Sequence, residues 1–519
     1  MVTPHSLASI IALARAGGLE RAWELFNRAP ADTGDAAAMA VLGRLLKDRA
    51  RQTPGLAQRS ALYREAASAY AKAARAQPSS YALINAATLF FLGGDTDSGT
   101  SGARRVLALL DENADEGETR YYRHATRSEA LLLLGQTAEA KQVLANALAT
   151  APYAWEDQAS TLRQFSLILE ARGEDSFWLD AYRPPSSVHF AGHMSFRADG
   201  RAADLRGEIG AFLQREKVGF GFGALAAGAD IIIAEALIDH GAELHAVLPG
   251  GSDAFAAVSV DPFGAEWRRR FDAVLGRATE VRSVRPISLA PNLETIALAD
   301  EVAMGAAVMN ARRLESRPVQ LLVVAEDASR RARDAWAEAG WHQHILTAPR
   351  EEPRPTDDVP ATRAGWRRLA VLAAAPGGVD DPPGEGLPEL AAAIAALAAP
   401  AVGPYLSGAE AIFAYDTPAE AARAAAELRR AVPGVRIGGH YGAAEPYQDP
   451  FSGGERIGGD AAAAAAGALA STLSGTVYVT EDFAAALMAS GSQAPRTEFI
   501  GELEAHDGGA PVGLFVLKS

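Results

Sequence analysis

The chain has 519 residues, of which 49% are apolar and 22% charged, a composition typical of a globular protein with about three domains. Its formal net charge of −15 disfavours a general nucleic-acid-binding protein, because phosphate binding needs a cationic surface. The chain contains no cysteine, which excludes disulfides, thiolate catalysis and cysteine metal sites.

Residues 1–178 are predicted to form helical repeats. The stretches "LARAGGLERAWELFNRAP" and "LLLLGQTAEAKQVLANALATAP" share one layout: an apolar helix end, a glycine turn, an amphipathic helix and a proline. Alanine-rich helix pairs of this kind are typical of tetratricopeptide-like (TPR-like) repeats, which usually supply a binding surface and rarely carry out chemistry. A generic helical bundle is the alternative.

Three stretches in this region resemble the TRAFs-binding domain. They are "SSYALINAATLFFLGGD" (79–95), "YYRHATRSEALLLLGQTAEA" (121–140) and "YAWEDQASTLRQFSLIL" (153–169). That domain is known from the apoptosis signal-regulating kinases and from bacterial signalling proteins. The resemblance implies a regulatory region that binds a protein partner, although no kinase follows it here.

Residues 183–346 alternate between strand, loop and helix. "VHFAGH", "VGFGFG" and "VQLLVVAE" are apolar runs separated by helical patterns. Continuous apolar strands joined by helices indicate a parallel sheet covered on both faces, which is a Rossmann-like α/β domain. The proline- and charge-rich segment 347–365 is predicted to be a linker.

Two glycine-bearing turns in this domain are candidate ligand loops. "AGHMS" (191–195) and "GFGALAAGAD" (221–230) follow predicted strands, and ligands of open parallel sheets bind outside the carboxyl ends of the strands. Glycines let backbone N–H groups approach an anion, and the next helix adds its partial positive charge. Glycines at such junctions serve close packing about as often, so this signal alone leaves both interpretations open.

Together, "FAGHMS", "GALAAGADIIIAEALIDHGAELHAVLP", "EWRRRF" and "DEVAMGAAVMNARRL" resemble the SLOG superfamily of Rossmann-like domains, which includes nucleotide-processing enzymes and nucleotide sensors. The resemblance implies these nucleotide-binding residues: Gly192, His193, Met194, Gly221, Gly223, Gly228, Asp230 and Glu301. The "PGGxGTxxE" element of the enzymatic members is absent, and "LPGGSD" (248–253) comes too early and is interpreted as a turn. Binding is therefore favoured over cleavage of an N-glycosidic bond. His193 has the alternative role of a hydrogen-bonded structural residue.

Residues 366–519 mix strands and helices in an order that resembles a class III nucleotide cyclase, an α+β ferredoxin-like fold. The best matches are "AIFAYDTPAEAARAAAELR", "RIGGHYG", "GTVYVTEDFAAAL" and "GELEAHDGGAPVGLFVL". Class III cyclase domains form their active sites across a dimer interface, so the resemblance also implies a homodimer through this region.

The cyclase resemblance lacks the residues of the reaction. Members of the family hold two Mg²⁺ ions with two aspartates, where this chain has alanines at 373–375 and Ala409. The family's asparagine and arginine lie on a helix that is here the alanine run 461–466, with Asp460 and a glycine turn as its expected cap. Asp380 and Asp381, or Glu410, are poor substitutes because none has a partner at metal-ligand spacing. Asp449 is a remaining polar candidate for a functional role in this region, and the same holds for Glu455 and Arg456. For Asp449 the favoured interpretation is a turn former before proline.

The sequence thus predicts a non-catalytic regulatory protein of three domains: a TPR-like interaction domain (1–178), a SLOG-like domain (183–346) and a pseudo-cyclase (366–519). We expect a protein partner, a nucleotide or nucleotide derivative as ligand, a homodimer, no required cofactor, no metal and no catalytic residue. No segment approaches the ~20 apolar residues that span a bilayer, and no basic signal region begins the sequence, so we expect a cytoplasmic protein without membrane contact. An N-glycosidic hydrolase in the middle domain and a purely structural scaffold are the alternatives.

Overall fold

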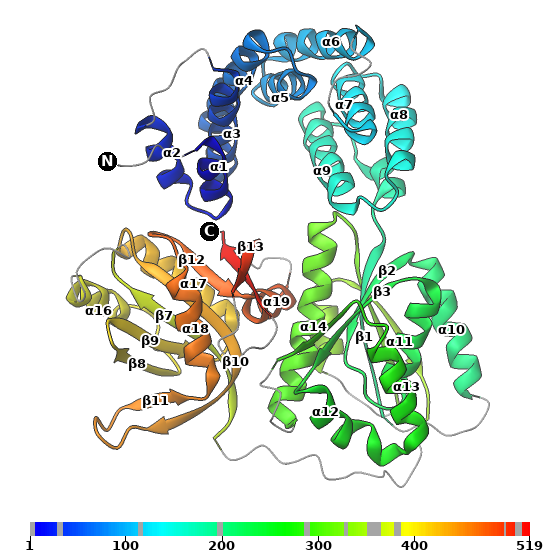
Figure 1. Ribbon diagram of the computed structural model, residues 1–519, viewed down its shortest axis with the longest axis vertical. Coiled ribbons are helices and arrows are strands. Elements are labelled where there is room, and N and C mark those ends of the chain that lie inside the picture. The colour runs from blue at the N-terminus through cyan, green and yellow to red at the C-terminus, as the bar shows by residue number, and fades with distance from the viewer. Residues whose placement is uncertain are drawn as a thin grey trace. The chain divides into compact units, whose positions relative to one another are not determined.

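The computed structural model describes the chain in ten segments. They are 6–28, 35–112, 118–194, 201–284, 291–325, 331–349, 365–377, 386–491, 495–503 and 511–518. The chain divides into two compact units: unit 1 is Met1–Pro184 with Arg313–Glu315, and unit 2 is Pro185–Arg312 with Ser316–Ser519. Unit 2 contains both of the sheets that the sequence assigned to separate domains (Figure 1).

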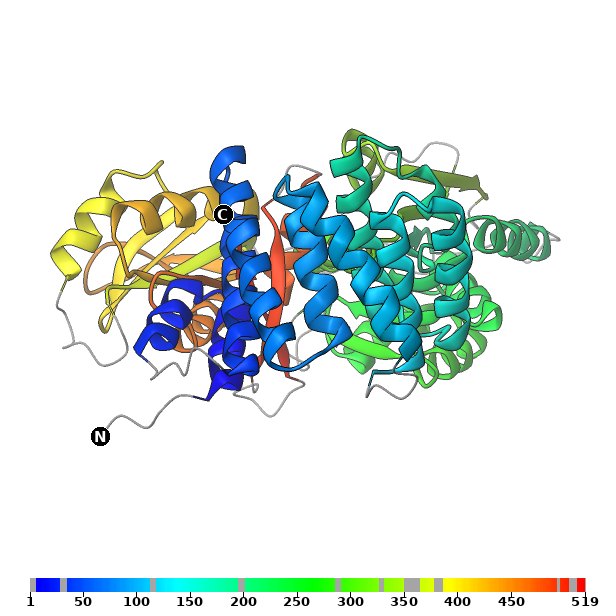
Figure 2. The same cartoon turned by 90° about the horizontal axis from the view of Figure 1, so that it is seen from above.

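Unit 1 consists of packed helices, which confirms the predicted helical repeats. Consecutive helices pair as α1 with α2, α3 with α4, α5 with α6 and α7 with α8, while α9 packs against α5 and α7. Figure 2 shows these helices arranged side by side in chain order. Their bounds are α1 (Leu7–Arg15), α2 (Leu19–Arg28), α3 (Ala36–Gln52), α4 (Leu56–Ala76), α5 (Ser80–Leu92), α6 (Thr96–Glu112), α7 (Arg120–Leu133), α8 (Thr137–Thr150), α9 (Trp155–Arg172) and the 3₁₀ helix η1 (Phe177–Tyr182).

Local chemistry accounts for where these helices begin and how closely they pack. Asp35 caps α3 by accepting a hydrogen bond from the Ala37 N–H at 3.0 Å. Gly43 of α3 faces the Tyr70 ring of α4, and a Cβ at position 43 would lie 2.6 Å from that ring. The glycine therefore lets the two helices approach, as small residues do at the contact points of helical repeats.

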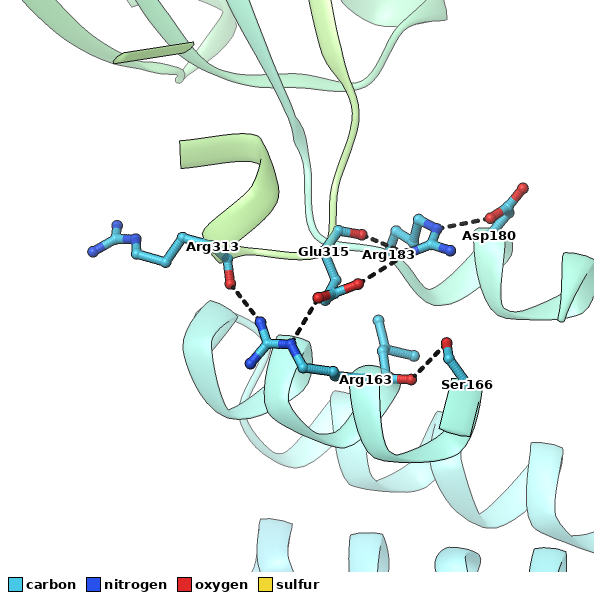
Figure 3. A network of polar contacts seen from close by, with 7 residues as sticks. Arg163, Ser166, Asp180, Arg183, Arg313 and Glu315 are labelled. Atoms are coloured by element: carbon cyan, nitrogen blue, oxygen red, sulfur yellow. Dashed lines mark hydrogen bonds and ion pairs between the residues drawn. The ribbon is translucent and has the colours of Figure 1, made fainter. Parts of the chain in front are cut away.

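A polar network holds three late residues of the chain within unit 1 (Figure 3). Glu315 has a left-handed backbone (φ 52°), and its carboxylate lies 2.8 Å from Arg163 Nε of α9. Arg183 donates to the Glu315 carbonyl at 2.7 Å and pairs with Asp180 at 2.7 Å. Arg163 also donates to the Arg313 carbonyl at 3.3 Å. These contacts explain why Arg313–Glu315, far along the chain, folds with the helices.

A second polar group crosses the interior of unit 1. Lys47 of α3 donates to Asn85 Oδ1 of α5 at 3.2 Å, and Thr88 of α5 donates to the Glu129 carboxylate of α7 at 2.6 Å. Burial raises the pKa of Glu129 above its ordinary value of 4.5, and burial lowers the pKa of Lys47. Each group is thus held in an environment that disfavours its charged form.

The raised pKa of Glu129 predicts a specific pH dependence. The folded chain keeps the Glu129 proton at pH values where the unfolded chain has released it, so this residue lowers the stability of unit 1 as pH rises from about 4.5 towards neutrality. Glu129→Gln removes the titrating group and keeps an acceptor for Thr88. We expect its unit 1 melting temperature to exceed that of the wild type at pH 8 and to match it near pH 4.5, by differential scanning calorimetry of the full chain. Glu65→Gln, at an exposed position of α4, is the control and should follow the wild type; equal profiles for Glu129→Gln and wild type would contradict the prediction.

The first sheet of unit 2 confirms the predicted parallel architecture. Within the described residues it has six strands in the order β4-β3-β2-β1-β5-β6, and every neighbouring pair is parallel. The strands are β1 (Ser186–Gly192), β2 (Val218–Gly223), β3 (Glu243–Leu248), β4 (Glu280–Ser283), β5 (Pro318–Val324) and β6 (His342–Thr347). The helices are α10 (Arg201–Arg215), α11 (Ala229–His240), α12 (Ser252–Ser259), the 3₁₀ helix η2 (Asp261–Phe263), α13 (Ala265–Leu275), α14 (Leu293–Arg313) and α15 (Arg331–Glu338). All positions of β1 are buried, which explains its lack of apolar–polar alternation.

The second sheet of unit 2 is mixed, as expected for the C-terminal region. Its order in the described residues is β13-β14-β12-β10-β7-β9-β8, with β11 pairing with β10; β10 and β12 are parallel and the other pairs antiparallel. The strands are β7 (Arg367–Ala375), β8 (Val402–Ser407), β9 (Glu410–Tyr415), β10 (Arg436–Gln448), β11 (Glu455–Gly458), β12 (Val477–Thr480), β13 (Thr497–Leu503) and β14 (Val512–Leu517). The helices are α16 (Leu387–Ala395), α17 (Pro418–Ala431), α18 (Asp460–Ala470) and α19 (Glu481–Ala489).

Three further sequence predictions have structural outcomes. The stretch "LPGG" forms a bend between β3 and α12, as predicted. Most of the predicted linker 347–365 lies outside the described residues. None of the helices in the described segments is both long enough and apolar enough to cross a membrane.

Candidate functional site

The strand order of the parallel sheet reverses between β1 and β5. From β1 the chain adds β2, β3 and β4 on one side, and then β5 and β6 on the other, so the topology switches at the β1–β5 pair. Open α/β sheets bind ligands outside the carboxyl ends of the strands at such a switch point. Here β1 ends at Gly192, and the His193 N–H donates to the Val323 carbonyl of β5 at 3.2 Å. The sequence indicated the turn after β1 but not β5 as its neighbour.

The structure brings the two predicted glycine turns together. Met194 pairs with Gly228 in an isolated bridge, and the Ala229 N–H donates to the His193 carbonyl at 3.3 Å. Gly228 precedes α11 with φ 119°, a conformation that favours glycine. Met194 is half-buried, whereas His193 and Gly228 are buried, so Met194 is the most accessible of the three.

Asp230 ties these turns to each other. Its carboxylate accepts hydrogen bonds from the Gly192 N–H at 2.7 Å and from the Ala226 N–H at 3.3 Å. The residue is 5% exposed and lies in the first turn of α11, where the helix dipole favours a negative charge. Asp230 therefore positions the loop backbone, and its role as a ligand contact stays a prediction.

His193 is buried against the end of the sheet. Its Nδ1 lies 3.0 Å from the Met194 carbonyl oxygen and its Nε2 lies 2.9 Å from the Ala348 carbonyl oxygen. Because carbonyl oxygens only accept, a neutral ring can satisfy one of them and an imidazolium satisfies both. These contacts support the structural alternative for His193.

Three of the predicted glycines are needed for packing. A Cβ at Gly192 would lie 2.0 Å from the Ala229 Cβ, one at Gly221 2.4 Å from Leu237, and one at Gly223 2.5 Å from the Phe190 carbonyl oxygen. Close packing therefore accounts for glycine at these three positions, while their role as ligand contacts stays a prediction.

Glu301 has its contacts on the C-terminal sheet. It accepts a hydrogen bond from the Tyr441 hydroxyl of β10 at 2.8 Å and forms an ion pair with Arg368 of β7. The structure thus shows Glu301 in contact with the C-terminal sheet. The other predicted residues His193, Met194, Gly228 and Asp230 meet at the carboxyl end of β1.

A polar group inside the parallel sheet was not predicted from the sequence. Gln320 of β5 donates to His189 Nδ1 of β1 at 2.9 Å, so His189 carries its proton on Nε2 and donates to the Asp300 carboxylate of α14 at 3.2 Å. Gln343 of β6 donates to the Gln320 side chain. His189 and Gln320 are fully buried, and the signal available in the sequence was a histidine and a glutamine within otherwise apolar strands.

In the C-terminal sheet, the positions where cyclases carry metal aspartates hold no carboxylate. Ala373 and Ala374 are fully buried in β7, Ala375 ends that strand, and Ala409 lies in the turn between β8 and β9. Asp380 and Asp381 lie outside the described residues. In the part of the chain that the structure describes, no three His, Asp or Glu side chains cluster as a metal site would need.

The carboxyl group of Glu410 and the guanidinium of Arg436 lie on either side of Ala375. The strand registers place Glu410 of β9 and Arg436 of β10 on either side of Ala375, in one row of the sheet. Burial raises the pKa of Glu410, and attraction to Arg436 opposes that rise. Arg436 also donates to the Gly377 carbonyl at 3.1 Å, so its guanidinium is held beside Ala375.

The alanine run forms α18, as predicted, and the helix packs on the sheet through its methyl groups. Ala461, Ala465 and Ala468 are buried, and a Cβ at Gly438 of β10 would lie 2.3 Å from the Ala465 carbonyl oxygen. The N-cap is Gly459 (φ 90°), with Asp460 in the first turn, so the expected capping role of Asp460 is wrong. Small side chains on both elements allow this close approach.

Asp449 forms a tight loop, which supports its interpretation as a turn former. It accepts hydrogen bonds from the Phe451 N–H and the Ser452 hydroxyl, both at 2.9 Å, and pairs with Arg456 at 2.6 Å. These contacts and Arg456 itself lower the pKa of Asp449. A cavity of about 300 Å³ lies beside this loop and is lined by Pro400, Ala401, Val402, Gly403, Pro404, Tyr405, Ser452, Gly454, Glu455 and Arg456. Since Asp449 neutralises Arg456 and Glu455 adds a negative charge, this cavity does not favour an anion.

Comparison with known proteins places two regions of the chain. Residues 7–90 match the family model described as Tetratricopeptide Repeats-Sensor. The guanylyl cyclase domain of the RhoGC fusion protein from Blastocladiella emersonii is similar at 11% identity, over 30% of this chain and 96% of that one, with a TM-score of 0.24. An adenylate/guanylate cyclase/hydrolase from Silicibacter pomeroyi is similar at 21% identity, over 30% and 99%, with a TM-score of 0.24. The adenylyl cyclase CyaB from P. aeruginosa is similar at 11% identity, over 30% and 95%, with a TM-score of 0.25. No curated protein matches.

Proposed function

We propose that this chain is a signalling protein without cyclase activity. Its helical repeats bind a protein partner, its parallel-sheet part binds a nucleotide or nucleotide derivative, and its C-terminal part acts as a non-catalytic module that forms a homodimer. The observation that carries the proposal is the row Glu410–Ala375–Arg436, which offers one carboxylate beside a guanidinium, whereas cyclisation needs two metal-bound carboxylates. The apolar α18 supports the same conclusion, because it offers methyl groups in place of the family's asparagine and arginine.

The nucleotide site is proposed at the switch point where β1 and β5 end. Support comes from the switch in strand order, from the Met194–Gly228 bridge and from Asp230, which hydrogen-bonds to the backbone of both turns. Met194 is the described residue here whose replacement tests the site without disturbing a buried hydrogen bond.

A thermal-shift screen of the full chain with ATP, GTP, NAD and ADP-ribose tests the nucleotide proposal. We expect at least one of them to raise the melting temperature of unit 2, since a ligand that binds only the folded state stabilises it. Met194→Glu should abolish the shift by repelling the phosphates, and Met194→Gln, of similar length and neutral, should keep it. No shift with any of the four would refute a nucleotide site, and release of free base or ribose would favour the hydrolase alternative.

A cyclase assay with Mg²⁺ or Mn²⁺ and ATP or GTP tests the C-terminal module. We expect no cyclic nucleotide above the level of a heat-denatured sample, because the row around Ala375 offers one carboxylate and one competing guanidinium. Product formation that Ala375→Lys abolishes would contradict the proposal.

A further inference from the structure

Helix α14 is buried between the two sheets of unit 2. Its contacts reach β1 of the parallel sheet and β7, β10 and α19 of the C-terminal part. A helix whose buried residues lie on more than one face is covered on several sides. Its buried residues are Thr295, Leu298, Ala299, Val302, Ala303, Met304, Gly305, Ala306, Ala307, Val308 and Ala311.

One face of α14 is attached to β1. The Asp300 carboxylate accepts the hydrogen bond of His189, and Asn310 Nδ2 donates to the Ser187 hydroxyl at 3.0 Å. His189 and Ser187 are both fully buried. The strand that ends at the proposed nucleotide site is therefore fastened to α14 at two points along its length.

A different stripe of α14 is attached to the C-terminal part. This stripe consists of residue 294 and the residues 7, 11 and 18 positions after it, which are 301, 305 and 312. These spacings are close to whole turns of a helix with 3.6 residues per turn, so the four residues lie on one face. Glu294 and Glu301 form ion pairs with Arg368 of β7, and Glu301 also accepts from Tyr441. At the other end of the stripe, Arg312 donates to the Met488 sulfur at 3.0 Å and to the Gly491 carbonyl at 3.3 Å.

The middle of this stripe is closely packed against α19. The backbone of α14 at Gly305 contacts the Ala485 carbonyl of α19 so closely that a Cβ would lie 1.7 Å from that oxygen. Packed interiors move between discrete arrangements and do not deform continuously. A displacement of α14 by β1 must therefore be followed by α19, β7 and β10 or must break buried polar contacts.

We propose that α14 transmits the state of the switch point between β1 and β5 to the C-terminal sheet through two different faces. The input of this device rests on the proposed function, because it needs a ligand with different affinities for two positions of β1. The adjacent carboxylates Asp300 and Glu301 contact different sheets, since Asp300 holds His189 of the parallel sheet and Glu301 holds Tyr441 and Arg368 of the C-terminal sheet. A second link runs in parallel, from Arg282 at the end of β4 to Glu481 (2.8 Å) and Asp482 at the start of α19.

A double-mutant cycle on the full chain tests this linkage without a ligand. Ser187→Ala removes one of the two hydrogen bonds from β1 to α14, and Tyr441→Phe removes the hydrogen bond from β10 to α14; each deletes only a hydroxyl, so the variants should fold. If the two sheets are not coupled, the effects of the two substitutions add. We expect the double variant to lower the unit 2 melting temperature by less than the sum of the two single shifts, because α14 is already more weakly held on one face.

Tyr415→Phe provides the matched control. Its hydroxyl donates to the Ala398 carbonyl at 3.0 Å within the same C-terminal part, and that bond does not involve α14. Ser187→Ala combined with Tyr415→Phe should be additive. Additivity of Ser187→Ala with Tyr441→Phe as well would overturn the proposal.

Hydrogen exchange tests separately whether a nucleotide binds and whether its binding affects the C-terminal sheet through α14. With the nucleotide that gives the largest thermal shift, we expect slower exchange in β7 and β10 of the wild type and at least a twofold smaller change in Tyr441→Phe. Binding with unchanged exchange in β7 and β10 would overturn the linkage while the proposed function stands. If no nucleotide binds, the proposed function fails, and the double-mutant cycle still decides the linkage.

Discussion

Gly305→Ala is expected to destabilise unit 2 by about 3 kcal/mol. The added Cβ would lie 1.7 Å from the Ala485 carbonyl oxygen and 2.2 Å from its carbonyl carbon. Both are backbone atoms, so no side chain can rotate away and the two helices must separate. Separation would also weaken the pairs that Arg312 and Glu301 make along the same stripe. Urea unfolding of the full chain, followed by hydrogen exchange in α14 and α19, measures the loss.

Gly207→Ala is the control for that substitution. Gly207 is an exposed residue of α10, in the same unit, and a Cβ there would meet nothing within 4 Å. Alanine is the better helix former, so this variant should be more stable than the wild type by roughly 0.5–1 kcal/mol. Equal stability of Gly305→Ala and the wild type would mean that α14 and α19 do not meet as described.

Asp230→Ala should cost about 3 kcal/mol and should also abolish nucleotide binding. The substitution leaves the N–H groups of Gly192 and Ala226 without the carboxylate that now accepts from them at 2.7 and 3.3 Å. Each unpaired buried donor carries a desolvation penalty of about 1–3 kcal/mol. The turns after β1 and β2 would lose their common anchor. Thermal unfolding and the nucleotide thermal-shift screen together report both effects.

Asp230→Asn tests the charge of this side chain separately from its shape, because asparagine has nearly the same shape as aspartate and no charge. The amide keeps one oxygen for the Gly192 N–H but presents an NH₂ group to the Ala226 N–H, so we expect an intermediate loss of stability. A variant Asp230→Ala that is as stable as the wild type would show that the carboxylate does not hold the turns. Retained stability with lost binding would instead make Asp230 a ligand contact.

The two sheets of unit 2 are connected mainly through glycine and charged residues. Gly305 allows backbone contact, while Arg368 and Arg282 each pair with two acids from the other part. Attraction to Glu301 raises the pKa of Arg368 although burial alone would lower it. Breaking one member of such a buried group leaves an uncompensated charge, so we expect substitutions in this interface to be strongly destabilising.

Local signals were enough to predict most elements of the fold. The continuous apolar runs predicted β1 and β5, and the alanine run predicted α18, because helix propensity and burial on both faces act within about ten residues. Of the predicted cap of α18, the glycine turn is confirmed, because Gly459 is the N-cap with the positive φ that the turn requires, whereas Asp460 lies in the first turn of the helix.

The glycines show where a sequence becomes ambiguous. Gly221 and Gly228 both belong to the stretch "GFGALAAGAD", yet the first is a packing contact with Leu237 and the second sets the turn into α11. A glycine in a sequence shows that a side chain is absent but not which atoms occupy its place.

The sequence by itself determined the class of each region and the positions of the turns after β1 and β2, and it predicted that alanines at 373–375 and Ala409 stand where a cyclase has aspartates. Only the tertiary structure decided that Asp230 anchors two loops, that Glu301 faces another sheet, and that Glu410 and Arg436 flank Ala375. The reason is physical: propensity and periodicity depend on neighbours along the chain. The partners of Glu301 are 67 and 140 positions away and are selected by the packing of whole sheets.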